Sequence, residues 1–160
     1  MKKLLALVAI LPAVSLSVPC FGVDWIRDRI YTSSSYGWLG ADYGLGYHYT
    51  DSVKISVGPV VKPVLSKEIL AELGFMAKLH YHYKLESTGI TPYITFGIGG
   101  VTKLSSQEQQ DQDLEGFFSY QIGSGINLPL SARTSVFAGY KLQKFHKLLH
   151  GVEFGMSFNL

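Results

Sequence analysis

Histidines are the side chains of this sequence with the clearest capacity for chemistry. His80 and His82 stand two residues apart, so on a β-strand they would point to the same face. His48 belongs to an earlier predicted strand, 39–49, and is expected to face the same interior. Imidazole nitrogens grouped in this way could bind zinc or copper. We favour hydrogen bonding inside the fold instead, with no metal and no cofactor bound.

Single charged residues occur on the same alternating positions as these histidines. A charge enclosed in a narrow interior is costly unless an opposite charge neutralises it, so the lysines require acids nearby. Asp28 would add an acid if the segment around it is a strand. The set that we expect to share one polar interior is Asp42, His48, Lys54, Lys78, His80, His82, Lys84, Lys141 and Glu153.

The elements that would position these side chains are β-strands, because apolar and small or polar residues alternate with a period of two. One face of each segment carries Leu, Ile, Val, Phe or Tyr, and the other carries Gly, Ser or Thr with a few charges. The alternation is visible in seven segments: 39–49, 53–58, 73–85, 90–99, 118–128, 135–143 and 151–160.

The composition of the polar face decides between a soluble and a membrane-spanning barrel. Charged residues make up 16% of the chain, against about 25% in typical soluble domains. A face of Gly and Ser suits a narrow lumen, and the apolar face suits lipid. We therefore predict an all-β, eight-stranded, antiparallel, up-and-down transmembrane β-barrel in the outer membrane of a Gram-negative bacterium. A soluble periplasmic ligand-binding barrel is the alternative.

Closure requires an even number of strands, so an eighth must be found before residue 39. We place it at 23–31, although Arg27 and Arg29 share a face there with Trp25 and Tyr31. This segment could instead lie at the membrane interface or in the periplasm.

The N-terminus has the pattern of a secretory signal peptide, with Lys2 and Lys3 before an apolar run at 4–11. We expect residues 1–22 to be removed and 23–160 to form the barrel domain; cleavage after Ser17 and lipidation of Cys20 are alternatives. Removing two lysines and no acid leaves 12 basic and 12 acidic residues from 14 and 12, a balance that argues against a nucleic-acid partner. Cys20 is the only cysteine, which excludes a disulfide framework.

Connection lengths predict the orientation of the barrel, because bacterial barrels have short periplasmic turns and longer outer loops. Segments 32–35, 62–69, 103–116 and 146–150 should lie outside, and 50–52, 86–89 and 129–133 inside. A short helix over 66–73 is an alternative within one outer loop. Aromatic side chains at the periplasmic ends predict a girdle, with cross-strand aromatic pairs as the alternative: Tyr47, Tyr49, Tyr81 and Tyr83. The last alternating residues resemble the signal that the barrel assembly machinery reads: Phe154, Met156, Phe158 and Leu160.

Two segments, 92–99 (PYITFGIG) and 116–126 (GFFSYQIGSGI), flank a polar loop. With the rest of 91–160 they resemble the central hairpins of the outer-membrane lipid A deacylase (acyloxyacyl hydrolase) family. The chain is also similar, less specifically, to opacity-type and OmpA-like barrels. The deacylase resemblance implies an eight-stranded barrel that cleaves an ester-linked acyl chain with a Ser nucleophile, a His base and an acidic residue.

The His-x-Ser-Asn motif of that family has no match here. In one alignment Lys144 stands at the His position and His146 at the Ser position; in the other, His146 matches His and Leu148 matches Ser. No catalytic residue is carried over. We predict a non-enzymatic outer-membrane barrel with a plugged polar lumen, whose outer loops contact other molecules and whose partners are membrane lipid, lipopolysaccharide and the assembly machinery. The alternative is a divergent hydrolase with a site near the outer rim formed by His146, His150 and Glu153.

Overall fold

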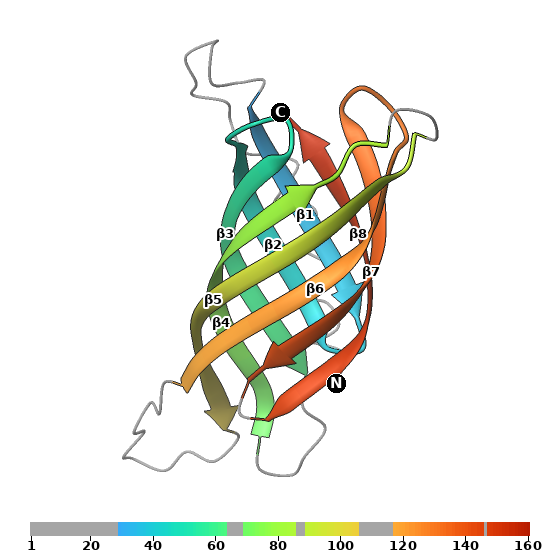
Figure 1. Ribbon diagram of the computed structural model, residues 1–160. Coiled ribbons are helices and arrows are strands. Elements are labelled where there is room, and N and C mark those ends of the chain that lie inside the picture. Colours follow the sequence, from blue (N-terminus) through green and yellow to red (C-terminus); the bar gives the residue numbers. More distant parts are fainter. Residues whose placement is uncertain (1–28, 64–68, 86–88, 106–116, 146) are drawn as a thin grey trace.

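The computed structural model describes residues 29–63, 69–85, 89–105, 117–145 and 147–160. They form a closed antiparallel barrel in which each strand pairs with its neighbours in sequence and the last pairs with the first (Figure 1). The predicted eight-stranded fold is confirmed. The strands are β1 (Ile30–Gly37), β2 (Gly40–His48), β3 (Val53–Pro63), β4 (Ile69–His82), β5 (Thr91–Ser105), β6 (Phe117–Pro129), β7 (Thr134–Lys144) and β8 (Leu148–Asn159).

Within the described residues, no helix is long and apolar enough to cross a membrane. The predicted signal peptide, 1–22, lies outside the described residues, and so does most of the segment 23–31.

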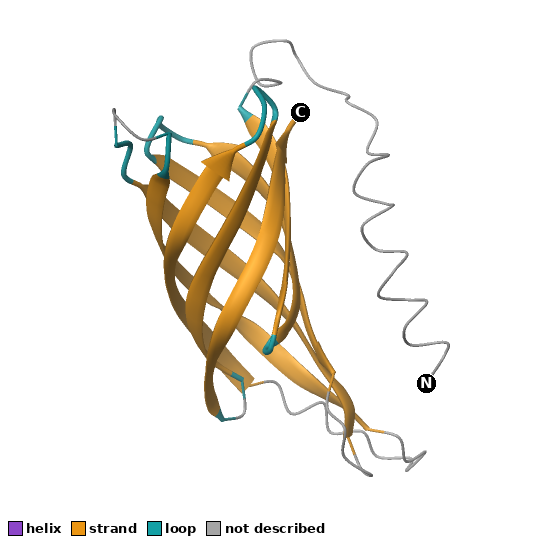
Figure 2. Ribbon diagram, turned by 90° about the vertical axis from the view of Figure 1, so that its right-hand side faces the viewer, coloured by secondary structure: helices purple, strands orange, loops and turns teal. Residues whose placement is uncertain are grey.

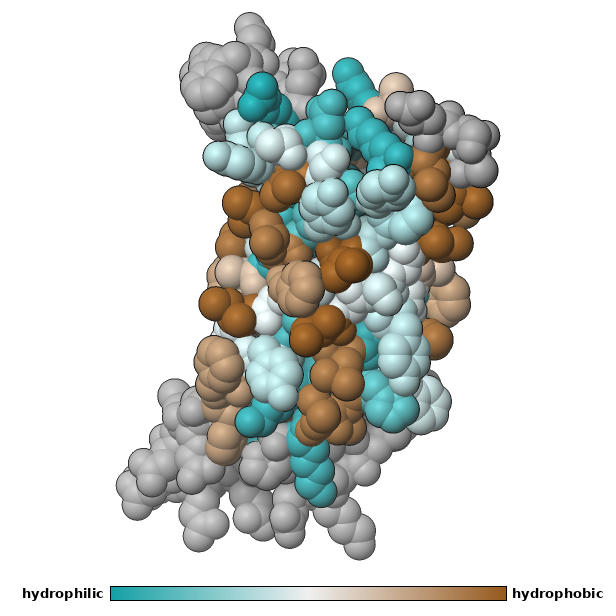
Figure 3. Space-filling view, viewed as in Figure 1, coloured by the Kyte–Doolittle hydropathy of each residue, from teal (hydrophilic) through white to brown (hydrophobic). Residues whose placement is uncertain are grey.

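Exposed and buried side chains alternate along the central strands, most clearly on β5 and β6. On β5, Ile94, Phe96 and Ile98 are exposed, whereas Thr95 between them is buried. Figure 3 shows the outer surface of one face: most apolar residues lie on the wall between the two ends of the barrel, among residues of intermediate hydropathy, and hydrophilic residues gather towards the end that carries the C-terminus. An apolar outer wall around polar interior positions is the arrangement of a transmembrane barrel.

The first strand differs from its predicted place. Residues 30–37 form β1, which pairs with β2 from Ile30↔Tyr47 and with β8 from Tyr31↔Asn159, so 32–35 is strand and not an outer loop. Its central Ser33, Ser34 and Ser35 carry no apolar alternation, which explains why the pattern did not reveal it. The neighbouring strands supply its hydrogen bonds on both sides.

Several hairpins also extend further than predicted. The β1–β2 connection is a tight turn in which Gly40 has φ 113°, a left-handed conformation that favours glycine. Residues 69–73 continue β4, so no helix includes them; residues 62–63 and 103–105 likewise belong to strands. Residues 148–150 belong to β8, which shortens the β7–β8 connection to 145–147.

The C-terminus lies at one end of the barrel, where β1 begins and β8 ends (Figure 2). We call this end the terminal rim and the opposite end the distal rim. Two turns of the terminal rim close with the same short pattern: the Thr50 hydroxyl accepts a hydrogen bond from the Val53 N–H at 3.0 Å, and the Ser131 hydroxyl accepts one from the Thr134 N–H at 3.1 Å. The connections 64–68 and 106–116, at the distal rim, lie outside the described residues.

Candidate functional site

The middle of the lumen contains an ion network contributed by four strands. Lys141 on β7 lies between two acids, with its Nζ 3.0 Å from Glu153 Oε2 on β8 and 3.6 Å from Asp42 Oδ2 on β2. Lys78 on β4 binds the other oxygen of the Asp42 carboxylate. All four side chains are at most 10% exposed. Two cations and two anions therefore neutralise one another inside the barrel.

Neutral donors complete this network. The Tyr93 hydroxyl donates to Glu153 Oε1 at 3.2 Å, and the Ser35 hydroxyl donates to Glu153 Oε2 at 3.4 Å. Hydrogen bonds of this kind satisfy carboxylate lone pairs that the ammonium groups leave free. Both donors occupy inward positions, but sequence reasoning did not select them, because it assigned aromatic residues to the lipid side and missed β1.

Histidines lie between the network and the terminal rim. His80 is held by two hydroxyls, Ser56 and Thr95, each 2.9 Å from a ring nitrogen. His48 Nε2 lies 3.0 Å from Asn159 Oδ1 on β8. Among the described residues, no group of three or more His, Cys, Asp or Glu side chains is arranged to hold a metal ion. The histidines of this region are thus engaged as hydrogen-bonding and packing groups.

The Ser56–His80 contact has the spacing of a nucleophile beside a base, but its surroundings do not suit catalysis. The third member is the Thr95 hydroxyl instead of a carboxylate, and Ser56 is 2% exposed. A substrate has no access to such a buried hydroxyl, so this pair is a structural hydrogen bond.

An apolar cluster fills the distal part of the lumen. Val60, Met76, Val101 and Phe145 are all at most 4% exposed and pack together, with Leu149 against them. The Gln143 side-chain amide, also fully buried, donates to Met76 Sδ at 3.2 Å. The alternation pattern placed Met76 on the inward face but did not reveal the cluster, because Val60, Val101 and Phe145 lie beyond the ends of the alternating segments.

Two of the residues predicted for a site, Lys84 and His150, lie outside the lumen. Lys84 follows the end of β4 at His82, and its side chain is 61% exposed and pairs with Asp51 at 3.6 Å, outside the lumen. His150 and Glu153 stand at positions of opposite parity on β8: His150 is exposed on the outer wall and bonds the Tyr140 hydroxyl, whereas Glu153 lies in the lumen network. His146 lies outside the described residues. His150 and Glu153, the two described residues of the alternative hydrolase site, therefore do not come together.

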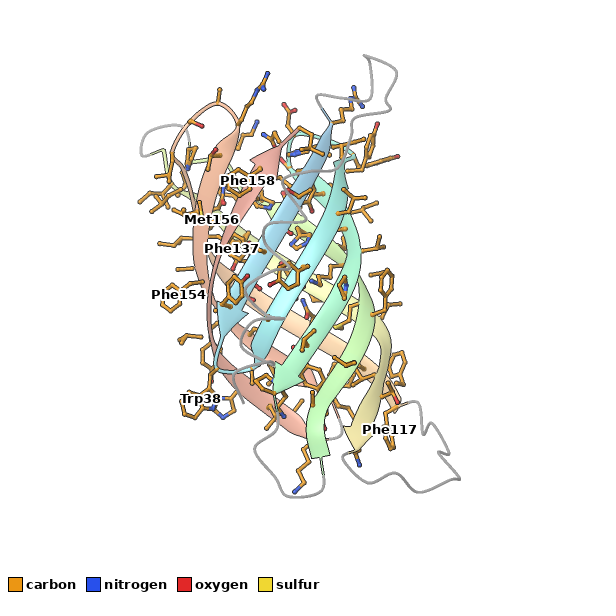
Figure 4. The ribbon with its side chains drawn as sticks, turned by 180° about the vertical axis from the view of Figure 1, so that it is seen from behind. Trp38, Phe117, Phe137, Phe154, Met156 and Phe158 are labelled. Atoms are coloured by element: carbon orange, nitrogen blue, oxygen red, sulfur yellow. The ribbon has the colours of Figure 1, made fainter. Side chains whose placement is uncertain are left out.

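The aromatic and terminal residues singled out in the sequence lie on the outer wall. The four predicted girdle tyrosines are at the terminal rim, where Tyr49, Tyr81 and Tyr83 are exposed and Tyr47 is half-buried. Phe154 and Met156 are exposed on β8, and Figure 4 shows Phe154 projecting away from the barrel. The Leu160 N–H donates to the Ile30 carbonyl at 3.0 Å, which ties the end of the chain to β1.

Comparison with known proteins gives the family. A family model described as "Surface antigen" matches residues 26–159. The chain belongs to this surface antigen family. No curated protein matches the sequence.

Solved structures resemble this chain at the level of the fold. The N-terminal β-barrel domain of Pseudomonas aeruginosa OprF has a TM-score of 0.64 and 16% identity, covering 84% of this chain and 98% of its own. Neisserial surface protein A (NspA) has a TM-score of 0.59 and 11% identity, covering 82% and 93%. A de novo designed transmembrane β-barrel has a TM-score of 0.50 and 16% identity, covering 82% and 92%.

The family and the fold together assign this chain to the outer membrane, as predicted. The OmpA-like part of the sequence resemblance agrees with these neighbours, whereas the comparisons give no support to the lipid A deacylase part.

The ion network predicts a large effect of one substitution. Lys141→Met should lower the free energy of unfolding by about 3 kcal/mol, because it leaves a buried carboxylate without its cation. Adding Glu153→Gln should restore more than half of the loss, since the uncompensated charge is then removed. The measurement is the urea unfolding midpoint in lipid vesicles, followed by tryptophan fluorescence. Lys84→Met, which removes an exposed lysine, is the control and should change stability by less than about 0.5 kcal/mol. Equal midpoints for Lys141→Met and Lys84→Met would contradict the account.

Proposed function

We propose that this surface antigen is a non-enzymatic outer-membrane barrel with a plugged lumen, and that its role is carried out by its connections on the cell surface. The observation that carries the proposal is the filling of the lumen: an apolar cluster around Phe145 at the distal end is followed by an ion network around Lys141. An eight-stranded barrel has an interior about wide enough for side chains alone. Neither layer brings a reactive group to a substrate-sized opening.

The expected orientation supports a function at the distal rim. Short turns and the ends of β1 and β8 are expected on the periplasmic side of bacterial barrels, and longer loops outside. The segments 62–69, 103–116 and 146–150 include the three distal connections between β3 and β8. The polar, acid-containing sequence SSQEQQDQDLEG within 103–116 suits a solvated surface loop. The family description, surface antigen, agrees with exposure of these segments to the exterior.

Lipid is the partner that the outer wall favours. Near the distal rim, Trp38 is 82% exposed and Lys144 is exposed, with its Nζ 5.8 Å from the centroid of the Tyr120 ring. A basic group beside aromatic rings at this level suits the anionic headgroup region of lipopolysaccharide. The alternating residues Phe154, Met156 and Phe158 of β8 support recognition by the barrel assembly machinery.

Conductance in planar lipid bilayers tests the plugged lumen. The purified protein should produce no discrete conductance steps, because side chains occupy the interior from the distal cluster to the ion network. A porin added afterwards to the same bilayer is the control and should produce steps. Reproducible steps from the surface antigen itself would identify a pore and overturn the proposal.

Cysteine labelling of intact cells tests the surface role. Gln109→Cys, in the connection between β5 and β6, should react with a membrane-impermeant maleimide in whole cells. Ala132→Cys, in an exposed turn of the terminal rim, is the matched control and should react only after the outer membrane is permeabilised. The opposite labelling pattern would reverse the orientation and remove the surface role of segment 103–116.

A further inference from the structure

The lumen contains a cavity between the ion network and the terminal rim. Its volume is about 50 Å³, measured as the space open to the centre of a water molecule. This is room for a few waters or one small ion. Asp42 and Glu153 of the network border the cavity on one side, and Tyr31, Lys54 and His82 are among the residues that line the rest.

Lys54 is a cation without a counter-ion in the described part of the chain. It occupies an inward position on β3, where it is partly buried, and no carboxylate of the described residues lies within 4.0 Å of its Nζ. Its ammonium group instead lies 5.3 Å from the centroid of the Tyr31 ring. Lys78 and Lys141 are matched by the two acids of the network, so Lys54 leaves the cavity with one positive charge in excess.

Two further polar groups at the cavity lack hydrogen bonds. The Tyr31 side chain is 3% exposed, and its hydroxyl lies beside Ser56 without a hydrogen bond of ordinary length. His82, also buried, makes only ring contacts within the described residues, with His80 and with Tyr93 at 5.8 Å between centroids. A buried polar group without a partner costs about 1–3 kcal/mol, so the Tyr31 hydroxyl favours a species that supplies an acceptor, and the His82 ring could donate to the same species.

We propose that the cavity is a binding site for a small inorganic anion, held by the Lys54 ammonium group with the Tyr31 hydroxyl and a ring N–H of His82 as further donors. An anion would neutralise the excess charge and also accept the unused hydrogen bonds. A water molecule would accept the hydrogen bonds but would not neutralise the charge. The acids that border the cavity do not repel the ion strongly, because each is already bound to a lysine of the network.

Access to the site is from the terminal rim. The apolar cluster around Phe145 fills the distal end, whereas the residues between the cavity and the terminal rim are polar, including His48 and Asn159. The site would therefore exchange ions with the same compartment as the chain ends.

Nuclear magnetic resonance of the folded, full-length chain in lipid nanodiscs tests the proposal. Sodium phosphate is titrated against sodium gluconate at constant ionic strength, because gluconate is too large for the cavity. The side-chain signals of Lys54 and Tyr31 should shift saturably with phosphate. Shifts that grow linearly without saturation, or that appear equally with gluconate, would overturn the proposal.

Three variants show whether the responding group is the lumenal lysine. Lys54→Met should abolish the saturable shift of the Tyr31 signal, and Tyr31→Phe should weaken phosphate binding about tenfold, as expected for a hydrogen bond to a charged group. Lys84→Met removes the same charge from the same rim outside the lumen and should leave binding unchanged. Unaltered binding in Lys54→Met or in Tyr31→Phe would overturn the site, as would an equal loss in Lys84→Met. Tyr31→Phe decides the question if Lys54→Met does not fold.

Discussion

Closure of the sheet is the constraint on which the rest of the structure depends. In hydrocarbon, each unpaired backbone N–H or C=O would cost several kcal/mol, so a membrane-spanning sheet must have no free edge. Here β1 and β8 meet that requirement by pairing from Tyr31↔Asn159 to Gly37↔Glu153. Once the sheet is closed, every second side chain points to lipid and the others share a narrow interior. The chemistry of the lumen follows from this division, because inward charges must find their partners among a few neighbouring positions.

The lumen meets this demand differently along its length. At the distal end apolar side chains around Phe145 exclude water, and in the middle Lys78 and Lys141 neutralise Asp42 and Glu153. Towards the terminal rim the buried Tyr31 hydroxyl has no hydrogen-bond partner, and Lys54 remains without an acid among the described residues. The interior thus changes from an apolar cluster, through a neutralised ion network, to a polar region around Lys54. Small residues permit this filling: a side chain at Gly99 would meet the Phe75 carbonyl oxygen at 2.1 Å.

Period-two alternation was sufficient to predict the fold from the sequence, and it failed where the physical reason for alternation is weak. Seven segments carry apolar residues on one face because that face meets lipid, but the Ser-rich β1 is held mainly by its neighbours and shows no such pattern. The alternation and the charges were sufficient to predict that Asp42, Lys78, Lys141 and Glu153 face the lumen. Which of them pair could not be predicted, because the pairs join strands that are distant in sequence. Alternation also places His150 and Glu153 on opposite faces of β8, whereas Lys84 was misplaced because alternation does not mark the end of β4. Tyr93 and Phe145 were missed because an aromatic side chain suits both lipid and a tightly filled lumen.

The most direct test of the central claim is the electrophoretic mobility of the protein from the outer-membrane fraction, with and without boiling. A closed membrane barrel resists detergent until it is heated, so the account predicts different mobilities for unboiled and boiled samples of that fraction. A protein that is released into the soluble periplasmic extract and shows one mobility under both conditions would contradict it. The apolar wall would then have to line a ligand cavity instead of facing lipid.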